Sequence, residues 1–299
     1  MSDDTSTFEA HRPALVALAY RMLGDLGRAE DVVQDSWLRW QGRDVAVDAP
    51  KAFLLKIVTR LCLNELGSAR ARREEARGDR LPEPVALDDA GLGNVEMLDQ
   101  ISMAFLVVLQ RLTPAERAVL LLHDVFDLSH SEIASLLKKT DPACRQLLSR
   151  ARENVAAERR VLQTSREEHR RLLAAFVRAS ASGEVEAMMS LLAEDAVLVV
   201  DTGPEGRRVG RIRNVRRPIV GSKHVAAFLG AVSRQGRAQS PLVERELNGQ
   251  PAMVYLKDGR PDSALLISVA DGRIRHIFVQ ADPERLTHIG PLTSWHELQ

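Results

Sequence analysis

Residues 129–155 combine two helix-start signals with a basic surface, a pattern typical of elements that read the major groove of DNA. Ser129 and Glu132 have the spacing of a capping box, so a helix is expected to begin there. A second helix is expected to begin at Thr140, whose hydroxyl can accept from free amides, while Pro142 needs no intrahelical bond in the first turn. The segment therefore predicts a helix-turn-helix.

The second of these helices has one apolar and one polar face. Its apolar stripe, with helical spacing, contains Cys144, Leu147, Leu148, Ala151 and Val155. Side chains on the opposite face can hydrogen-bond base edges and phosphates in a major groove. The residues predicted to contact DNA are Lys138, Lys139, Thr140, Ala143, Arg145, Gln146, Ser149, Arg150 and Arg152. A helical hairpin with a solvated charged face is the alternative that these residues leave open.

The composition is that of a globular chain of two or three domains. Of 299 residues, 45% are hydrophobic, and no apolar run approaches the roughly 20 residues that span a bilayer. The acidic, polar beginning is unlike a signal peptide, so we expect a cytoplasmic protein that does not bind membranes. Cys62 and Cys144 fall on predicted apolar stripes, which favours buried thiols over a disulfide or metal pair. We expect no metal and no cofactor.

Charge is gathered in clusters although the formal net charge is zero. Residues 138–152 carry five bases and one acid, and residues 79–99 carry six acids and one base. Residues 207–217 contain six arginines and no acid. Because a concentrated patch steers a protein toward phosphates more than net charge does, the basic clusters are candidate nucleic-acid or docking surfaces.

The hydrophobic periodicity divides the chain into four segments. Residues 1–77 predict a bundle of amphipathic helices, and residues 78–96 have the Pro, Gly and acidic composition of a linker. A second helical module is expected over 97–160, with a clear helix start at the Thr-Pro-Ala-Glu capping box of 113–116. Residues 163–299 change to helices followed by strands, which predicts an α+β domain.

Within that domain, helices are expected over 166–181, 184–192 and 222–233, and strands over 196–201, 242–247, 251–257, 264–269 and 273–280. Asn-Gly or Asp-Gly pairs at 248–249, 258–259 and 271–272 separate the last strands and predict tight antiparallel hairpins. A curved sheet wrapped over the helices would form a cone with a pocket.

Several segments carry further signatures. In the helical modules these are Ala19-Tyr20-Arg21-Met22-Leu23-Gly24, Ala29-Glu30-Asp31-Val32-Val33-Gln34-Asp35, Thr59-Arg60-Leu61-Cys62-Leu63-Asn64 and Cys144-Arg145-Gln146-Leu147-Leu148-Ser149-Arg150-Ala151-Arg152. Elsewhere they are Asp79-Arg80-Leu81-Pro82-Glu83-Pro84 and Asp282-Pro283-Glu284-Arg285-Leu286. In this order they resemble the extracytoplasmic-function sigma factors of the SigJ-like group. The resemblance implies two all-α modules, sigma regions two and four, followed by an α+β cone of the SnoaL-like, NTF2-superfamily type.

Two positions depart from the pattern of that group. Arg80 stands where the group has a Trp before its Leu-Pro-Glu-Pro motif. Residues 201–206 are a looser version of the group's glycine-rich Asp-Gly-Gly-Gly-Lys stretch.

The resemblance implies a subunit that binds core RNA polymerase, directs it to promoter DNA and helps to open the duplex. The helix face implied to contact polymerase carries Asp25, Glu30, Asp31, Gln34 and Asp35. The loop over 42–50 corresponds to the one that captures an unstacked base of the minus-ten element, and an unstacked base has a readable edge. The residues expected near this downstream element are Arg43, Asp44, Lys51, Arg60, Asn64, Arg70, Arg72 and Arg73.

We expect the C-terminal domain to regulate the protein by docking on the linker. Opposed charges suggest the contact, since acids populate the linker and arginines the C-terminal domain, and docking would set the separation of the two DNA-binding modules. The residues of this expected regulatory interface are Leu81, Pro82, Glu83, Pro84, Arg207, Arg208, Arg211, Asp282, Pro283 and Leu286. The arginines could instead touch nucleic acid or polymerase.

Three other functions stay open. SnoaL-like domains also resemble cyclases and isomerases that use a buried carboxylate or histidine as general base, or the domain could sense a small-molecule ligand. Asp195, in an expected turn, Asp201 at a strand end, His224, and His276 within a strand are the polar candidates, but no pair has a spacing that specifies an active site. We therefore expect no catalytic residue. A one-component repressor would explain the helix-turn-helix and leave the first helical module without a use.

Overall fold

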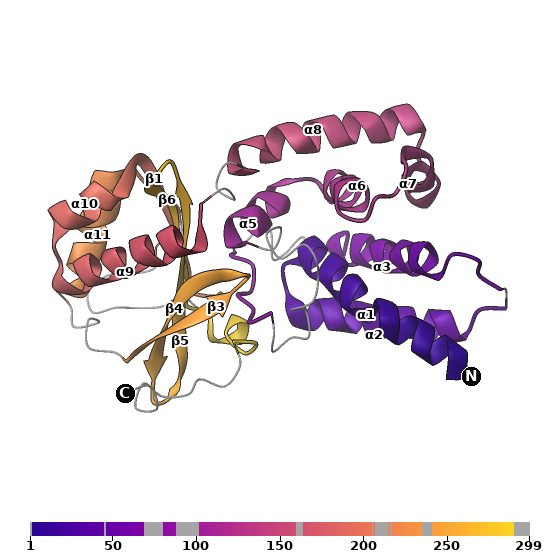
Figure 1. Ribbon diagram of the computed structural model, residues 1–299, viewed down its shortest axis with the longest axis horizontal. Coiled ribbons are helices and arrows are strands. Elements are labelled where there is room, and N and C mark those ends of the chain that lie inside the picture. The colour runs from indigo at the N-terminus through magenta and orange to yellow at the C-terminus, as the bar shows by residue number, and fades with distance from the viewer. Residues whose placement is uncertain are drawn as a thin grey trace. The chain divides into compact units, whose positions relative to one another are not determined.

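The computed structural model describes residues 2–44, 46–68, 80–87, 102–159, 164–204, 206, 215, 217–234 and 241–289. The chain forms two compact units (Figure 1). The first contains residues 1–76, 91–101 and 105–157, and the second contains residues 77–90, 102–104 and 158–299. The two helical modules thus share a unit, and the segment expected as a linker belongs in part to the C-terminal unit. Within the described ranges, no helix has the length and apolarity of a membrane span.

The first module contains the expected helical bundle. Its helices are α1 (Ser2–Leu23), α2 (Leu26–Gln41) and α3 (Pro50–Leu66), which pack on one another. Helix α2 begins where the carboxylate of Asp25 accepts a hydrogen bond from the amide of Arg28 at 2.9 Å. The bundle encloses the indole of Trp40, which is 1% exposed.

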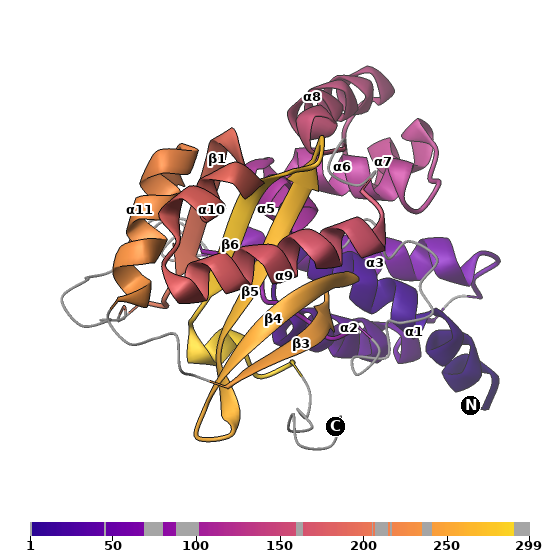
Figure 2. The ribbon, with the colours of Figure 1, turned by 60° about the vertical axis from the view of Figure 1, so that its left-hand side comes forward.

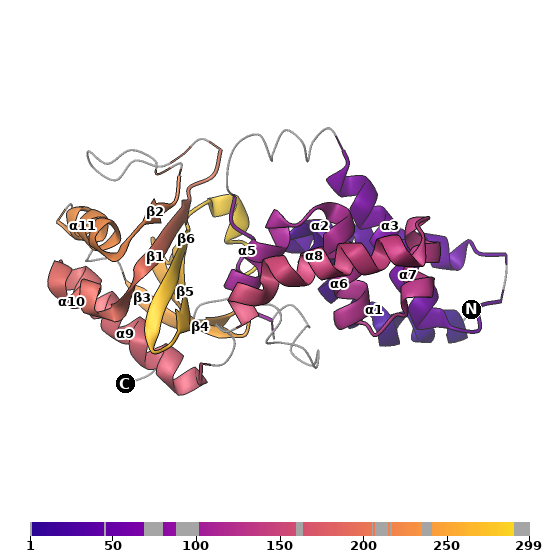
Figure 3. The same ribbon diagram turned by 90° about the horizontal axis from the view of Figure 1, so that it is seen from above.

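The second module contains α5 (Met103–Arg111), α6 (Pro114–Asp124), α7 (His130–Leu137) and α8 (Asp141–Arg159). The capping boxes expected at the starts of α6 and α7 are both present, and the hydroxyl of Thr140 accepts from the amide of Ala143 at 3.4 Å. Lys138 ends α7 in the left-handed conformation, with φ of 52°. Figure 3 shows the short α7 beside the N-terminal end of α8. The predicted helix-turn-helix is therefore confirmed.

A buried arginine connects the two modules within the first unit. The guanidinium of Arg117, 5% exposed, donates to the carbonyl oxygens of Gln110 at 3.1 Å and Leu112 at 3.3 Å, where α5 ends. It also donates to the carbonyl of Met22 in the last turn of α1. Carbonyl groups at helix ends lack intrahelical partners and carry negative partial charge, so they can solvate a buried cation.

The second unit has a sheet with helices on one face (Figure 2). The described strands, in sheet order, are β2 (Ile219–Val220), β1 (Leu192–Asp201), β6 (Arg273–Gln280), β5 (Arg260–Ala270), β4 (Gln250–Lys257) and β3 (Leu242–Leu247). Strands β3 to β6 form the expected antiparallel meander, whereas β1 pairs with β6 in parallel. The helices are α9 (Arg166–Ser182), α10 (Val185–Leu191) and α11 (Ser222–Ser233).

The three expected hairpin turns are confirmed by their backbone angles. Asn248, Asp258 and Asp271 have positive φ, as does the glycine that follows each of them. Two consecutive residues with positive φ are the signature of the turn that matches the twist of paired strands.

The sheet has an apolar core on its helix-covered face. Leu265, Ile267 and Ile277 point to this core, where they meet Leu173 and Phe176 of α9. Since neighbouring residues of a strand point to opposite faces, the residues beside these lie on the other face of the sheet. Asp201, which binds residue 81 of the linker segment, lies on that other face.

His169 of α9 makes stability depend on pH. It is 4% exposed, and burial lowers the pKa of its imidazole to about 4. Because the unfolded chain binds a proton near pH 6.5 and the folded chain does not, stability should fall as the pH is lowered from about 6.5 to about 4, by about 3 kcal/mol at most. Denaturant unfolding of His169→Phe should show a shallower pH profile over this range, whereas the exposed-site control His224→Gln should keep the wild-type slope. An unchanged slope in His169→Phe would contradict the assignment.

Candidate functional site

The face of α8 expected to read the upstream promoter element is exposed. Arg145, Gln146, Ser149 and Arg150 lie in solvent, opposite the buried stripe that includes Leu148. Lys138, Lys139 and Thr140 are also exposed in the turn before α8, and Ala143 is half-buried. The helix-turn-helix therefore presents these residues together on one surface, as DNA recognition requires.

Arg152 differs from the other predicted DNA contacts because its guanidinium has a partner within the protein. Its Nε donates to Asp124 Oδ2 at 3.1 Å and its Nη2 to Asp124 Oδ1 at 2.5 Å. Asp124 is the last residue of α6 and also contacts His123 Nδ1 at 3.0 Å. The pair raises the pKa of Arg152 and connects α8 to α6. A phosphate would have to compete with Asp124 for this side chain.

Only part of the polar face of α2 that is expected to contact polymerase is exposed. Asp31, Gln34 and Asp35 are exposed and Glu30 is half-buried, whereas Asp25 caps its own helix. Leu38, which sequence reasoning did not single out, is 61% exposed on the same helix, three and four residues after Asp35 and Gln34.

The residues expected near the downstream element are spread along the loop and helix α3. Asp44 lies in the loop between α2 and α3, Lys51 in the first turn of α3, and Arg60 and Asn64 toward the other end of that helix; all four are exposed. Arg43 is not free, because it is engaged by Trp40 and Asp4. Arg70, Arg72 and Arg73 lie outside the described residues.

A fourth site lies wholly in the second unit, where residues 80–87 are held by the C-terminal domain. We call this segment, with its partners Asp201, Asn248, Asp282, Arg285 and His288, the linker-docking site. Residues 81–87 are all buried although they form neither helix nor strand. Leu81 and Val85 are 1% and 0% exposed. A buried irregular segment is stable only if its backbone polar groups find partners.

The partners of that backbone come from three parts of the C-terminal domain. The amide of Leu81 donates to Asp201 Oδ2 at 3.0 Å, and the Leu81 carbonyl accepts from Arg285 Nη1 at 2.8 Å. The amide of Val85 donates to Asn248 Oδ1 at 3.3 Å, and the Val85 carbonyl accepts from the Asn248 amide at 2.8 Å. The amide of Ala86 donates to the carbonyl of His288 at 3.3 Å.

The prolines of the segment reduce the number of partners that are needed. Pro82 and Pro84 have no amide hydrogen, so burying them leaves no donor unsatisfied at those positions. Their fixed φ also lowers the entropy that the segment loses on docking. The alternation of proline with residues that have amides therefore suits an extended segment held by side chains.

An ion pair and a histidine–carboxylate contact complete the linker-docking site. Arg80 pairs with Asp282, so the residue that departs from the group's Trp acquires a partner in the C-terminal motif. The buried carboxylate of Glu83 contacts His288 Nδ1 at 2.5 Å. Gly203 approaches the Asp282 carboxylate so closely that a Cβ atom would lie 2.8 Å from its carbon. The tight turn at Gly203 thus needs glycine, both for this approach and for its φ of +76°.

The linker-docking site contains part of the expected regulatory interface. It brings Leu81, Pro82, Glu83, Pro84, Asp282 and Leu286 into the C-terminal unit, with Pro283 beside Asp282 in the short 3-10 helix. The partner of Glu83 is a histidine, where an arginine of the 207–217 cluster was expected. Arg207, Arg208 and Arg211 lie outside the described residues. Sequence reasoning missed the docking roles of Asn248, predicted only as a turn residue, of Arg285, quoted only within the Asp282–Leu286 motif, and of His288.

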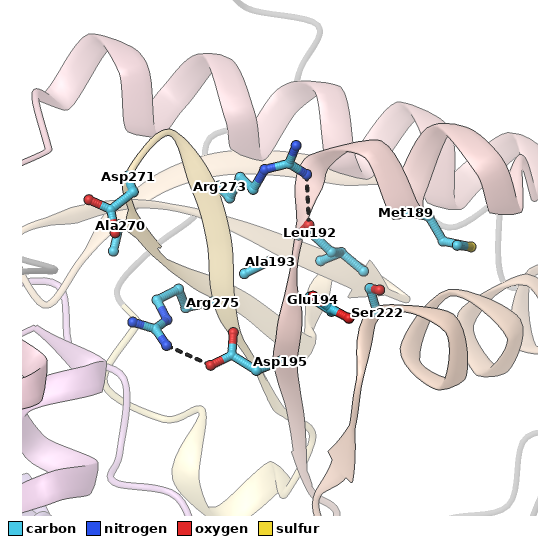
Figure 4. A pocket seen from close by; sticks show the side chains of 10 residues that line it. All are labelled: Met189, Leu192, Ala193, Glu194, Asp195, Ser222, Ala270, Asp271, Arg273 and Arg275. Atoms are coloured by element: carbon cyan, nitrogen blue, oxygen red, sulfur yellow. Dashed lines mark hydrogen bonds and ion pairs between the residues drawn. The ribbon is translucent and has the colours of Figure 1, made fainter.

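The carboxylate of Asp195 lies at the hollow drawn in Figure 4, which has a volume of about 550 Å³. The residue is within β1, so the expectation of a turn there was wrong; the strand begins directly after α10 at Leu192. Arg275 donates to Asp195 at 2.6 Å, and this bond lowers the pKa of the carboxylate. Arg273 is bound to the carbonyl of Leu192 at 3.1 Å. A carboxylate with a lowered pKa is a weak general base at neutral pH.

The other polar candidates also lie away from the helix-covered interior of the sheet. Asp201 and His276 occupy the opposite face, where Asp201 holds the linker and His276 contacts Ser268 Oγ at 2.8 Å. His224 is exposed, with Nδ1 3.0 Å from the carbonyl of Val220. These four side chains therefore do not converge on one reacting position.

Two family models match the helical modules. Sigma-70 region 2 matches residues 7–72, and Sigma-70, region 4 matches residues 102–155. The matches cover α1 to α3 and α5 to α8 respectively, which are the modules whose exposed faces are described above.

Whole-length relatives extend the match to the C-terminal domain. The chain is 36% identical over 297 residues to the ECF RNA polymerase sigma factor SigJ of Mycobacterium tuberculosis, covering 95% of this chain and 93% of that protein. It is 30% identical over 292 residues to the probable ECF RNA polymerase sigma factor SigI of the same species, covering 94% of each. The crystal structure of SigJ superimposes with a TM-score of 0.73 at 31% identity, covering 97% of this chain and 100% of that one. The chain therefore belongs to the extracytoplasmic function family of RNA polymerase sigma factors.

Proposed function

We propose that the C-terminal domain regulates this sigma factor by holding the linker between its two promoter-reading modules. The sigma function itself, binding of core RNA polymerase and recognition of promoters, follows from family membership. The observation that carries the proposal is the set of hydrogen bonds by which the C-terminal domain holds the buried backbone of Leu81, Val85 and Ala86. These residues lie between α3, which ends the first module, and α5, which begins the second.

The physical reason is the fixed geometry of DNA. Both promoter elements lie on one duplex, so the sigma modules must be separated by a defined span when both are bound. A flexible tether permits many spans, whereas a tether held at its middle permits fewer. Docking of residues 80–87 anchors the connection between α3 and α5 to the C-terminal domain, which thereby limits the spans that the two modules can reach.

Within this proposal, α8 reads the upstream element and α2 contacts polymerase. The support for α8 is its exposed basic face on a helix-turn-helix, and the support for α2 is its exposed acidic stripe with Leu38. The loop between α2 and α3 is assigned to the downstream element. Binding of a small-molecule ligand by the C-terminal domain stays a prediction.

Arg145 is the side chain of α8 best placed to read a base, since it is exposed near the start of the helix. Replacing it with alanine should cost about 1 to 3 kcal/mol of binding to a matched minus-thirty-five duplex and should relax the preference at one base position. The measurement is a fluorescence titration against duplexes substituted at each position. The control Arg171→Ala removes an exposed arginine of α9 and should leave binding unchanged. A uniform loss across all duplexes would contradict base reading by Arg145.

Release of the linker should broaden the tolerance for promoter spacing. Leu81→Asp places a charge in a buried position close to Asp201, so the segment should leave its site while the sheet stays folded. Transcription by the reconstituted holoenzyme on promoters with one to three base pairs added or removed should then depend less steeply on spacer length. Val220→Asp, the same chemistry at a position 57% exposed, is the matched control and should keep the wild-type profile. An unchanged profile in Leu81→Asp would refute regulation through the linker.

A further inference from the structure

Arg43, at the start of the loop between α2 and α3, is engaged inside the protein. Its guanidinium carbon lies 3.6 Å from the centroid of the Trp40 ring, which is the geometry of a cation–π contact. Its Nη1 donates to the Trp40 carbonyl at 2.6 Å, and its Nη2 forms an ion pair with Asp4 of α1. The side chain is 16% exposed, so little of it is available to solvent or to a phosphate.

Trp40 is itself the meeting point of the three helices of this module. Its indole Nε1 donates to the carbonyl of Asp4 at 3.0 Å, and its ring lies 6.0 Å, centroid to centroid, from that of Phe53 in α3. Asp4 therefore binds both side chains. Its backbone carbonyl accepts from Trp40, and its carboxylate pairs with Arg43. The start of α1, the end of α2 and the start of α3 are joined by these contacts.

The loop between these helices is fixed at both ends by the same tryptophan. Arg43 holds its beginning on Trp40, and Phe53, in the first turn of α3, holds its end. Between them the loop exposes Asp44, Ala46 and Asp48. A loop whose ends are held has fewer shapes to lose on binding, so its affinity for a partner is higher.

We propose that Arg43 is a positioning residue that, together with Asp4, fixes the loop of residues 42–49 in the shape that meets the downstream promoter element, and that Arg43 does not itself contact DNA. The proposal rests on the assignment of this loop to the downstream element. It also gives the N-terminal end of α1 a part in promoter opening.

The two roles of Arg43 predict opposite effects for a change at Asp4. If Arg43 bound a phosphate, Asp4 would compete for it, and removing the acid would strengthen DNA binding. If Arg43 positions the loop, removing the acid loosens the loop and weakens binding. Asp4→Asn makes this change with little loss of shape, because the backbone carbonyl that accepts from Trp40 remains.

The test uses the full chain assembled with core polymerase. Binding to a fluorescent single-stranded minus-ten oligonucleotide is measured over a range of salt concentrations, alongside the rate of open-complex formation on a whole promoter. Asp4→Asn and Arg43→Ala should each weaken oligonucleotide binding and slow opening about five- to tenfold, with the salt slope unchanged. Their double variant should be no weaker than the weaker single one, and Arg43→Lys should restore part of the loss. The control Glu9→Gln, an exposed acid on the same helix, should behave as wild type.

Four results would overturn the proposal. Stronger oligonucleotide binding by Asp4→Asn, or a smaller salt slope in Arg43→Ala, would make Arg43 a phosphate contact. Loss of core-polymerase affinity in both variants, together with a lower melting temperature, would show that the cluster only maintains the fold of the module. A wild-type holoenzyme without base preference at the minus-ten element would refute the assignment of the loop itself, which is a failure of the proposed function and is seen without any variant.

Discussion

The satisfaction of buried backbone groups in residues 80–87 is the constraint on which the organisation of the second unit depends. An extended segment outside any sheet needs a hydrogen-bond partner for each buried amide and carbonyl. Without these partners, the segment is more stable when it is exposed to solvent. Asp201 and Asn248 supply side-chain acceptors, and Arg285 supplies a donor. The two prolines lower the demand for acceptors. Without this set of partners, the segment would be an ordinary solvated linker.

The same logic accounts for several arginines that the charge pattern alone would assign to DNA or to solvent. Arg117 and Arg285 donate to backbone carbonyls, and Arg152 and Arg43 pair with carboxylates of neighbouring helices. A planar guanidinium has several donors in fixed directions, so one side chain can join two or three segments. Arg145 and Arg150 stay exposed on α8 and are the arginines, among the predicted DNA contacts of that helix, for which no ion pair with a neighbouring helix is described.

Local signals explain how much of the fold could be predicted from the sequence. The capping boxes at Thr113 and Ser129, and the Asn-Gly and Asp-Gly turns, act within four residues, and all are present in the structure. The misplaced residue is Asp195, because α10 passes into β1 at Leu192 without a turn, and helix and strand periodicities cannot locate such a boundary.

The docking contacts could not be predicted, for a physical reason. Leu81 and Asp201 are 120 residues apart in the chain, and Leu81 and Arg285 are 204 apart, so neither pairing leaves a local pattern. The charge clusters suggested docking between the linker and the C-terminal domain but indicated arginines of residues 207–217 as the partners. Single polar groups, such as the buried Asn248 and the half-buried His288, provide the described contacts. Among the described residues, the partners of the linker are therefore individual side chains placed by the fold and not members of a charge cluster.

Residue-resolved amide hydrogen exchange of the intact protein tests the central claim most directly. The amides of Leu81, Val85 and Ala86 each donate to the C-terminal domain, so they should be protected to a degree comparable with the amides of β5, the strand at the middle of the meander. Exchange of these three amides at the rate of an unstructured peptide, while β5 stays protected, would show that the linker is not held and would contradict the account.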